Sequence, residues 1–235
     1  MAIAKRNFRN VGSGLFSPTG PGAPTGFDTY TWAARPAAAS YPGLIIRISD
    51  VGPSSGSLFI SDGTYWVPLG GHLLLAAVAD AGLFTTSTTM VAMAGWSYVL
   101  RAGLWQKPGS MLRGTITGRR TGTLGSGGFP TIKLGWGASG GSNLAGGNAV
   151  TSAGNNSMRG QGIVSRVNDT QVRNQPGQGN YYGAIPSQAD GTASALETVS
   201  ATADLTIQAY GNVGNTPGVG ETTWVDIIML ELLVP

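Results

Sequence analysis

The chain has 235 residues, which is enough for one large domain or two small ones with a real hydrophobic core. Charged side chains are only 11% of it and the formal net charge is +3, which disfavours a nucleic-acid-binding protein because such proteins cluster Lys and Arg. The sequence has no cysteine, which excludes disulfides and thiolate metal sites, and no apolar run long enough to insert into a membrane.

Residues 1–43 are predicted to form an extended arm. Prolines recur among Gly, Ala, Ser and Thr without helical or strand periodicity, and no secretory signal follows the basic N-terminus. We therefore expect synthesis in a cytoplasm. A free linker has no use for so many aromatic rings, so the arm is expected to bind another surface, the alternative being a partly disordered tail. The candidate attachment residues are Lys5, Arg6, Phe8, Arg9, Phe16, Phe27, Tyr30 and Trp32.

Residues 44–71 are predicted to form a small β-hairpin unit. The triplet Ile-Ser-Asp occurs twice, ending at Asp50 and at Asp62, and each copy is followed by turn residues. Strands are expected over 44–49 and 57–61, with both aspartates capping turns by accepting backbone hydrogen bonds. Two alternatives are a catalytic carboxylate pair and a calcium site.

Residues 72–110 are apolar and rich in small residues, which favours an oligomerisation zone that leads into the C-terminal part. A short helix packing against copies of itself is the alternative to a strand for the first segment, "HLLLAAVADAGLF". His72 is the only histidine, so it cannot supply a His-based metal set and would have to serve any Ser-His-Asp triad. The predicted oligomer interface consists of Leu73, Leu74, Leu75, Trp96 and Trp105.

Residues 111–235 are predicted to be mainly β. Strand candidates separated by Gly- and Asn-rich loops indicate an antiparallel sandwich or barrel. The last strand candidate, "TTWVDIIMLELLVP", is largely apolar at both alternating sets of positions, so we expect both of its faces to be covered. The candidates span residues 111–121, 131–136, 162–169, 197–210 and 222–235.

Motifs that would indicate catalysis are missing from the sequence. The Gly-rich segments lack the phosphate-loop pattern, and the eleven carboxylates form no recognisable pair. We therefore predict no catalytic residue, no metal site and no cofactor. Three arginines, Arg113, Arg119 and Arg120, lie near Lys133 and Trp136 in the sequence. This grouping is compatible with polysaccharide or anion contact, or with an ordinary solvated sheet face.

Two segments resemble structural proteins of tailed bacteriophages. "GSLFISDGTYWVP", residues 56–68, is similar to a G-S-L-x-x-S-[DN]-G-x-x-W-x-P pattern of small virion proteins. "TADLTIQAYGNV" and "ETTWVDIIMLELLVP" are similar to the closing hairpin of the jelly-roll heads that end many phage fibres. The resemblance covers residues 44–68 and 202–235 and is thin between them.

This resemblance implies a homotrimer on the virion surface. The arm, residues 1–43, would dock on capsid, portal-tail or baseplate proteins, a short intertwined collar would follow over 44–71, and residues 111–235 would form a jelly-roll-like β-sandwich head. A host-surface glycan or protein is a further implied partner, whereas nucleic acid is not. No long shaft is present, which favours a short spike or a capsid-surface protein.

The expected function is therefore that of a non-enzymatic tail fibre, spike or receptor-binding protein with a possible role in host adhesion. One alternative is a head fibre that decorates and stabilises the capsid. An alternative of another class is a polysaccharide-degrading, tailspike-like enzyme. Binding to host polysaccharide without release of sugar fragments would separate adhesion from degradation.

Overall fold

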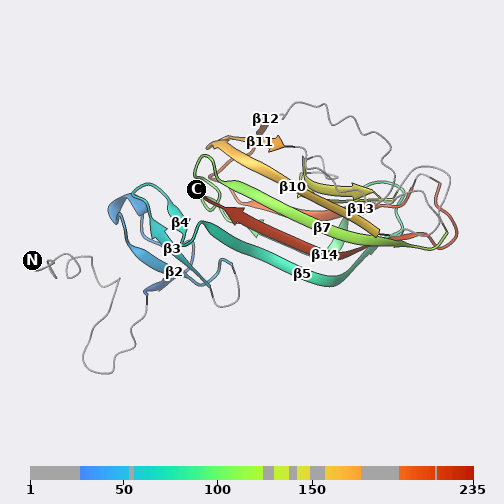
Figure 1. Cartoon of the computed structure of the whole chain (residues 1–235), viewed down its shortest axis with the longest axis horizontal. Helices are drawn as coiled ribbons and strands as arrows, with labels where there is room; N and C mark the ends of the chain where they lie inside the picture. The colour runs from blue at the N-terminus through green and yellow to red at the C-terminus, as the bar shows by residue number, and fades with distance from the viewer. Residues whose placement is uncertain are drawn as a thin grey trace, which may run out of the picture. The chain divides into compact units, whose positions relative to one another are not determined.

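The computed structural model describes residues 27–52, 56–123, 130–137, 142–148, 157–175, 196–214 and 216–235 (Figure 1). The fold is mainly β with several antiparallel sheets, as predicted, and a single 3-10 turn, η1 (Ala38–Ser40), is the helical content of these ranges. The chain divides into two compact units. Unit 1 comprises Met1–Leu75 with Val234–Pro235, and unit 2 comprises Ala76–Leu233.

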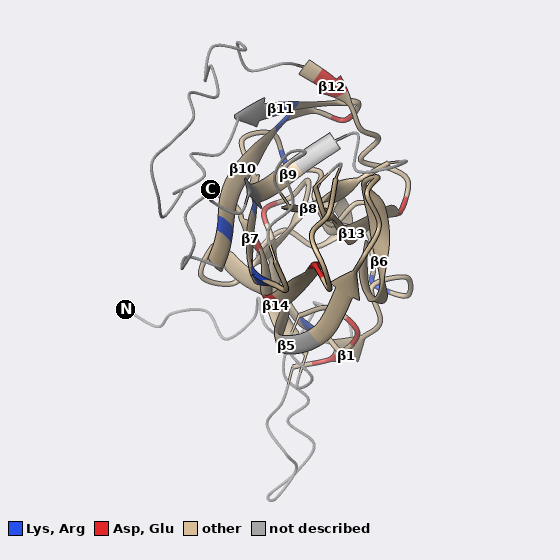
Figure 2. Ribbon diagram, turned by 90° about the vertical axis from the view of Figure 1, so that its right-hand side faces the viewer, with Lys and Arg blue, Asp and Glu red and all other residues tan. Residues whose placement is uncertain are grey.

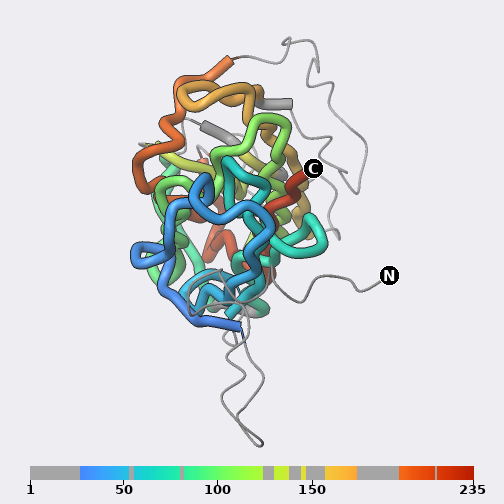
Figure 3. The backbone as a smooth tube through the Cα atoms, turned by 90° about the vertical axis from the view of Figure 1, so that its left-hand side faces the viewer, coloured from blue at the N-terminus to red at the C-terminus, as the bar shows by residue number. Residues whose placement is uncertain are grey.

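Unit 1 is built around a four-stranded sheet, coloured blue to cyan in Figure 3. The strands predicted over 44–49 and 57–61 are confirmed, and the second of them continues through a turn into a third strand. Ile46, Ile48 and Phe59 are completely buried, and the Trp32 ring lies 5.4 Å from the Phe59 ring. In order across the sheet, the strands are β1 (Thr29–Tyr30), β2 (Ile45–Ile48), β3 (Ser57–Ser61) and β4 (Trp66–Pro68).

The folded part of unit 1 begins before residue 44. Strand β1 pairs with β2 in parallel, and Trp32 is only 4% exposed. The carbonyl of Pro36 accepts a hydrogen bond from Trp66 Nε1 (2.9 Å), and that of Ala38 accepts one from Ser61 Oγ (2.7 Å). Phe27, Tyr30 and Trp32 were assigned to an extended arm because their segment lacks periodicity. The segment is nevertheless held by contacts to residues far along the chain, which a local pattern does not reveal.

Unit 2 contains a six-stranded and a four-stranded sheet, whose strands are seen nearly end-on in Figure 2. The six-stranded sheet has the order β12 (Leu196–Thr198), β11 (Gln171–Gln175), β10 (Ser157–Asn168), β7 (Met111–Thr121), β14 (Thr222–Leu233) and β5 (His72–Thr85), where β5 enters from unit 1. The four-stranded sheet has the order β6 (Val91–Leu100), β13 (Leu205–Asn212), β8 (Thr131–Trp136) and β9 (Ser142–Asn148).

The two sheets pack face to face over an apolar core. The side chains that meet there are completely buried and come from the central strands of both sheets. They include Leu112, Ile116, Ile132, Leu134, Ile207, Ile228 and Leu230.

Strand β9 lies unusually close to β10. A Cβ atom on Gly162 would lie 1.8 Å from the Leu144 carbonyl oxygen, and one on Gly160 would lie 2.2 Å from the Gly146 carbonyl oxygen. Glycine at these positions lets the two backbones touch, where side chains would normally hold packed sheets about 10 Å apart. The high glycine content of the chain thus has a structural use in the core of unit 2.

The alternative of a helix in the segment after residue 72 is wrong, because this segment is the long strand β5. Alanine-rich sequence suits a helix by propensity, but pairing with distant strands overrides local preference. The neighbouring apolar segment forms β6, in which Tyr98 is the register partner of Ile207 and Leu100 that of Leu205.

The last strand departs from simple alternation. A register shift lies between Val225 and Ile227 in the pairing of β14 with β7. Val225, Ile228 and Leu230 consequently all face the core with no exposure, while Ile227 is 47% exposed on the other face. Simple alternation would put Trp224 and Ile228 on the same face, because they are four residues apart, but a bulge at Asp226 separates them. Within the chain, only one face of this strand is fully covered.

Candidate interaction surface on the six-stranded sheet

An aromatic and charged cluster lies on the outer face of the six-stranded sheet. Phe84 on β5 lies 4.9 Å from the Trp224 ring on β14, measured between ring centroids. The Arg119 guanidinium of β7 lies 5.4 Å from the centroid of the same indole and also forms an ion pair with Asp226. These side chains meet because Arg119 and Trp224 are register partners on neighbouring strands.

A second ion pair lies further along the same two strands. Arg113 Nε donates to Glu231 Oε2 at 2.5 Å, and these residues are also register partners. Glu231 is only 5% exposed. The hydrogen bond to Glu231 raises the pKa of Arg113 above its usual value, so the cation is held firmly in its charged form. The charge of this buried carboxylate is thus compensated inside the chain.

We define the β7–β14 surface as Phe84, Arg119, Trp224, Asp226 and Ile227. Phe84 is 56% exposed, so an aromatic ring and an aliphatic side chain face outward beside a paired cation and anion. Aromatic rings bind apolar faces of ligands, and the paired charges offer hydrogen-bond donors and acceptors beside the rings. The cations of this sheet, on β7, β10 and β11, are coloured blue in Figure 2. The arrangement is suited to binding a ligand.

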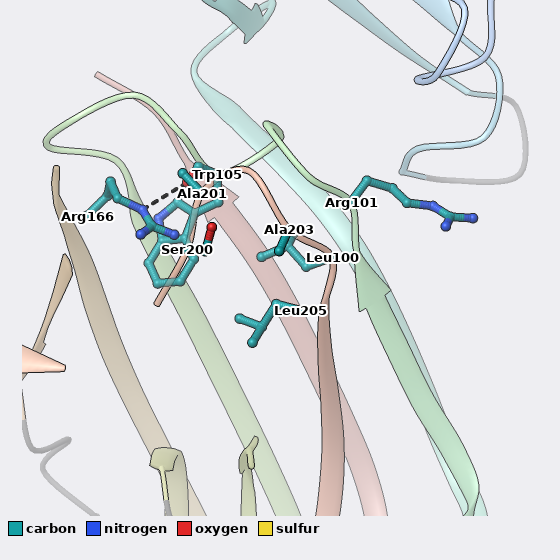
Figure 4. Close-up of a pocket in the computed structure, with 8 residues that line it drawn as sticks. All are labelled: Leu100, Arg101, Trp105, Arg166, Ser200, Ala201, Ala203 and Leu205. Carbon is teal, nitrogen blue, oxygen red and sulfur yellow. Dashed lines mark hydrogen bonds between the residues drawn. The ribbon is translucent and has the colours of Figure 1, made fainter. Parts of the chain in front are cut away.

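A small depression lies at one end of unit 2, beside the buried Arg166 (Figure 4). Its volume of about 10 Å³ has room for about one water molecule and is far below that of a small-molecule site. Arg166 Nε donates to the Trp105 carbonyl (2.9 Å) and Nη1 to the Val199 carbonyl (2.5 Å), while the guanidinium lies 4.4 Å from the Trp105 ring centroid. Burial lowers the pKa of Arg166 to about 10, so it is still charged at neutral pH. Arg166 therefore fastens two loops to β10.

The two predicted turn-capping aspartates bind different segments. Asp62 Oδ1 accepts hydrogen bonds from the backbone amides of Thr64 (2.9 Å) and Tyr65 (2.7 Å), the local pattern of an Asp-led turn. Asp50 Oδ1 accepts one from the backbone amide of Trp32 (2.7 Å), which lies 18 residues earlier. Asp50 therefore ties the segment around Trp32 to the end of β2.

The residues predicted for an oligomer interface do not form one surface. Leu73, Leu75 and Trp105 are each less than 5% exposed within the chain. Trp105 packs edge-on against Trp136, with their ring centroids 6.5 Å apart, and is part of the core. Leu74 and Trp96 are half-buried and remain accessible for contact.

The predicted arm lies only partly within the described residues. Phe27, Tyr30 and Trp32 belong to unit 1, whereas Lys5, Arg6, Phe8, Arg9 and Phe16 lie outside the described ranges. His72 begins β5 and is exposed.

The basic and aromatic grouping around Arg113 is divided by the fold. Arg120 and Trp136 are buried and Lys133 belongs to the other sheet, so only Arg113 and Arg119 share the outer face. Sequence reasoning missed Phe84, Trp224 and Asp226, because they join Arg119 only through long-range strand pairing.

No cluster of three or more His, Asp or Glu side chains suited to a metal ion occurs in the described ranges. No helix in this part of the chain has the length and apolar character needed to cross a bilayer. Comparison with protein families finds no matching family, and comparison with curated proteins finds no match.

Proposed function

We propose that this chain is a non-enzymatic structural protein of a tailed-phage virion. It acts as a short homotrimeric fibre or spike that attaches through its N-terminal residues and exposes unit 2 as a head. The expected location is the virion surface, and the partners are two further copies, a virion protein at the N-terminus and a host-surface molecule at the head.

The strand order of unit 2 carries this proposal. Strands β5-β14-β7-β10 form one sheet of unit 2, and β6-β13-β8-β9 form the other. Strands β11 and β12 extend the first sheet beyond β10. When these eight strands are followed along the chain, each lies in the opposite sheet from the one before it, except that β8 and β9 are neighbours in one sheet. This order supports the proposal of a jelly-roll head, because a jelly roll is an eight-stranded double sheet common in viral capsid and lectin domains. Fold alone does not define function, so the argument needs further support.

The second support is the position of the phage-like sequence pattern. Residues 56–68 correspond to β3, its turn and β4, and so to the core of the small unit that precedes the head in the sequence. The pattern residues have structural roles there: Trp66 is buried, and Asp62 holds the turn. A small β unit followed by a jelly-roll head is the organisation that the resemblance implies.

The third support is the β7–β14 surface, which offers a binding platform on the proposed head. Host adhesion requires contact with glycans or proteins, and an aromatic ring beside paired charges suits either. This observation favours a role in adhesion over a purely stabilising role on the capsid.

The experiment is a particle-binding assay with a truncated chain. Residues 1–26 should be removed rather than 1–43, because the latter deletion would also remove the buried Trp32. The shortened protein should have the mass of a trimer, three times 24.0 kDa for the full chain, less the deleted segment. It should no longer sediment with virions, whereas the full chain should.

Two results would overturn the proposal. A monomeric full-length chain at micromolar concentration would contradict the trimer, and normal virion binding by the truncated chain would contradict attachment through residues 1–26. Release of sugar fragments from host polysaccharide would favour the enzyme alternative.

A further inference from the structure

Strands β5 and β6 form one flank of unit 2. In the described part of the chain, β5 ends the six-stranded sheet and β6 ends the four-stranded sheet. A Cβ atom on Gly95 of β6 would lie 3.0 Å from Leu83 Cδ2 of β5, so the two strands are close neighbours. Figure 2 shows both strands at the rim of the sandwich. The flank thus contains two edge strands side by side.

This flank lacks the usual protection of sheet edges. Soluble proteins blunt exposed edges with charged side chains, proline or very short strands. Residues 73–100 contain one charged residue, Asp80, and no proline, although β5 has 14 residues and β6 has 10. At the opposite edges, β12 has only three residues, including Glu197, and β9 has seven with a register shift in its pairing.

The backbone geometry favours side-chain packing over addition of another strand. Gly95 has a φ of 107°, and the pairing of β6 with β13 shifts register beside it. Such a bulge bends an edge strand and interrupts the row of backbone groups that an incoming strand would need. A partner at this flank therefore has to be bound mainly through side chains.

The side chains of the flank are apolar, small and incompletely covered. Tyr98 faces the same side as its buried partner Ile207, and Trp96 shares that side, yet both rings are only half-buried. Val99 is 39% exposed on the opposite side of β6. Alanines add to the uncharged surface, namely Ala77 and Ala79 on β5 and Ala92 and Ala94 on β6, all of them exposed.

We propose that this β5–β6 flank, made of Ala77, Ala79, Ala94, Trp96, Tyr98 and Val99, is the surface through which copies of the chain contact one another. The inference rests on the proposed homotrimer and assigns its interface. The six residues named carry no charge for recognising a charged partner, whereas another copy presents the same uncharged, small-residue strip. Symmetric packing about a common axis then covers the half-buried rings and the unprotected edges.

The test introduces a charge at the flank and at a matched position elsewhere. Val99→Lys on β6 and Ala79→Lys on β5 are the test variants, and Val167→Lys on β10 is the control. Val99 and Val167 are 39% and 38% exposed, so the same substitution has a similar cost for folding at both. Oligomer mass is measured by sedimentation over a range of protein concentrations, and circular dichroism confirms that each variant is folded.

Burying like charges at an interface is costly, so each test variant should raise the concentration needed for assembly by at least about tenfold. Val167→Lys should assemble like the parent. If the parent is oligomeric and both test variants keep its mass and concentration dependence, the flank assignment is refuted while the homotrimer stands. If the parent itself is monomeric, the homotrimer and the flank assignment both fail. Equal weakening by Val167→Lys would also refute a contact specific to the flank.

Discussion

Replacing Gly162 by alanine tests the close contact between β9 and β10. In an ordinary strand position this change would stabilise the protein by roughly 0.5–1 kcal/mol, because glycine loses more backbone entropy on folding than alanine does. Here the new methyl group would lie 1.8 Å from the Leu144 carbonyl oxygen, and the obstacle is backbone that cannot rotate away. Overpacking of a core costs about 1–3 kcal/mol, and a clash with backbone belongs at the upper end of that range.

We therefore expect Gly162→Ala to lower the free energy of unfolding by about 3 kcal/mol. For a unit of this size, this corresponds to a fall in Tm of roughly 6–12 °C. Thermal unfolding followed by circular dichroism measures it, at one fixed protein concentration because assembly shifts Tm. Gly137→Ala is the control, since Gly137 has a φ of 84° but open space around it, and backbone strain alone should cost about 1–2 kcal/mol. An unchanged or raised Tm for Gly162→Ala would refute the close contact.

Three further predictions concern single side chains. Arg166→Met should destabilise unit 2 by about 2–4 kcal/mol in urea unfolding, because the carbonyls of Trp105 and Val199 lose a charged donor. Arg101→Met is the control and should cost much less, because Arg101 is largely exposed. The hydrogen bond from the backbone amide of Ala102 lowers the pKa of Asp204 in the folded protein. The ionised Asp204 therefore stabilises the fold above its unfolded-state pKa of about 3.9, and this contribution is lost as the pH falls through the lower folded-state pKa. Asp204→Asn should flatten this acid limb of the Tm curve, and an unaltered limb would argue against it. Asp62→Ala should lower the free energy of unfolding by an amount on the order of 1 kcal/mol. Asp62→Asn should lower it clearly less, because the amide oxygen still accepts the hydrogen bonds from Thr64 and Tyr65. Equal losses for the two variants would contradict the role of Asp62 in holding the turn.

Strand existence was predictable where local signals agree. Residues 111–121 and 131–136 were predicted as strands and form β7 and β8 with the same bounds. Their alternation and the Gly-rich turns around them carry enough information, because each side chain's face depends only on its position in the strand.

Other features depend on pairing between distant segments and are invisible to local patterns. Strand β5 contains alanines that suit a helix, and only its place beside β14 makes it a strand. The bulge at Asp226 switches which alternate residues of β14 face the core, and the position of the bulge depends on how β14 pairs with β7. The β7–β14 surface was missed for the same reason, since Phe84 and Arg119 are brought to Trp224 by the sheet.

A cryo-EM map of the intact virion tests the central claim most directly. We predict threefold-symmetric projections on the particle surface, each fitted by three copies of unit 2 with their β5–β6 flanks turned toward one another. The two sheets of unit 2, with β10 and β9 in close contact, should fit the density of each copy without rearrangement. A map of virions that contain the chain as single copies, or virions from which the chain is absent, would contradict the account.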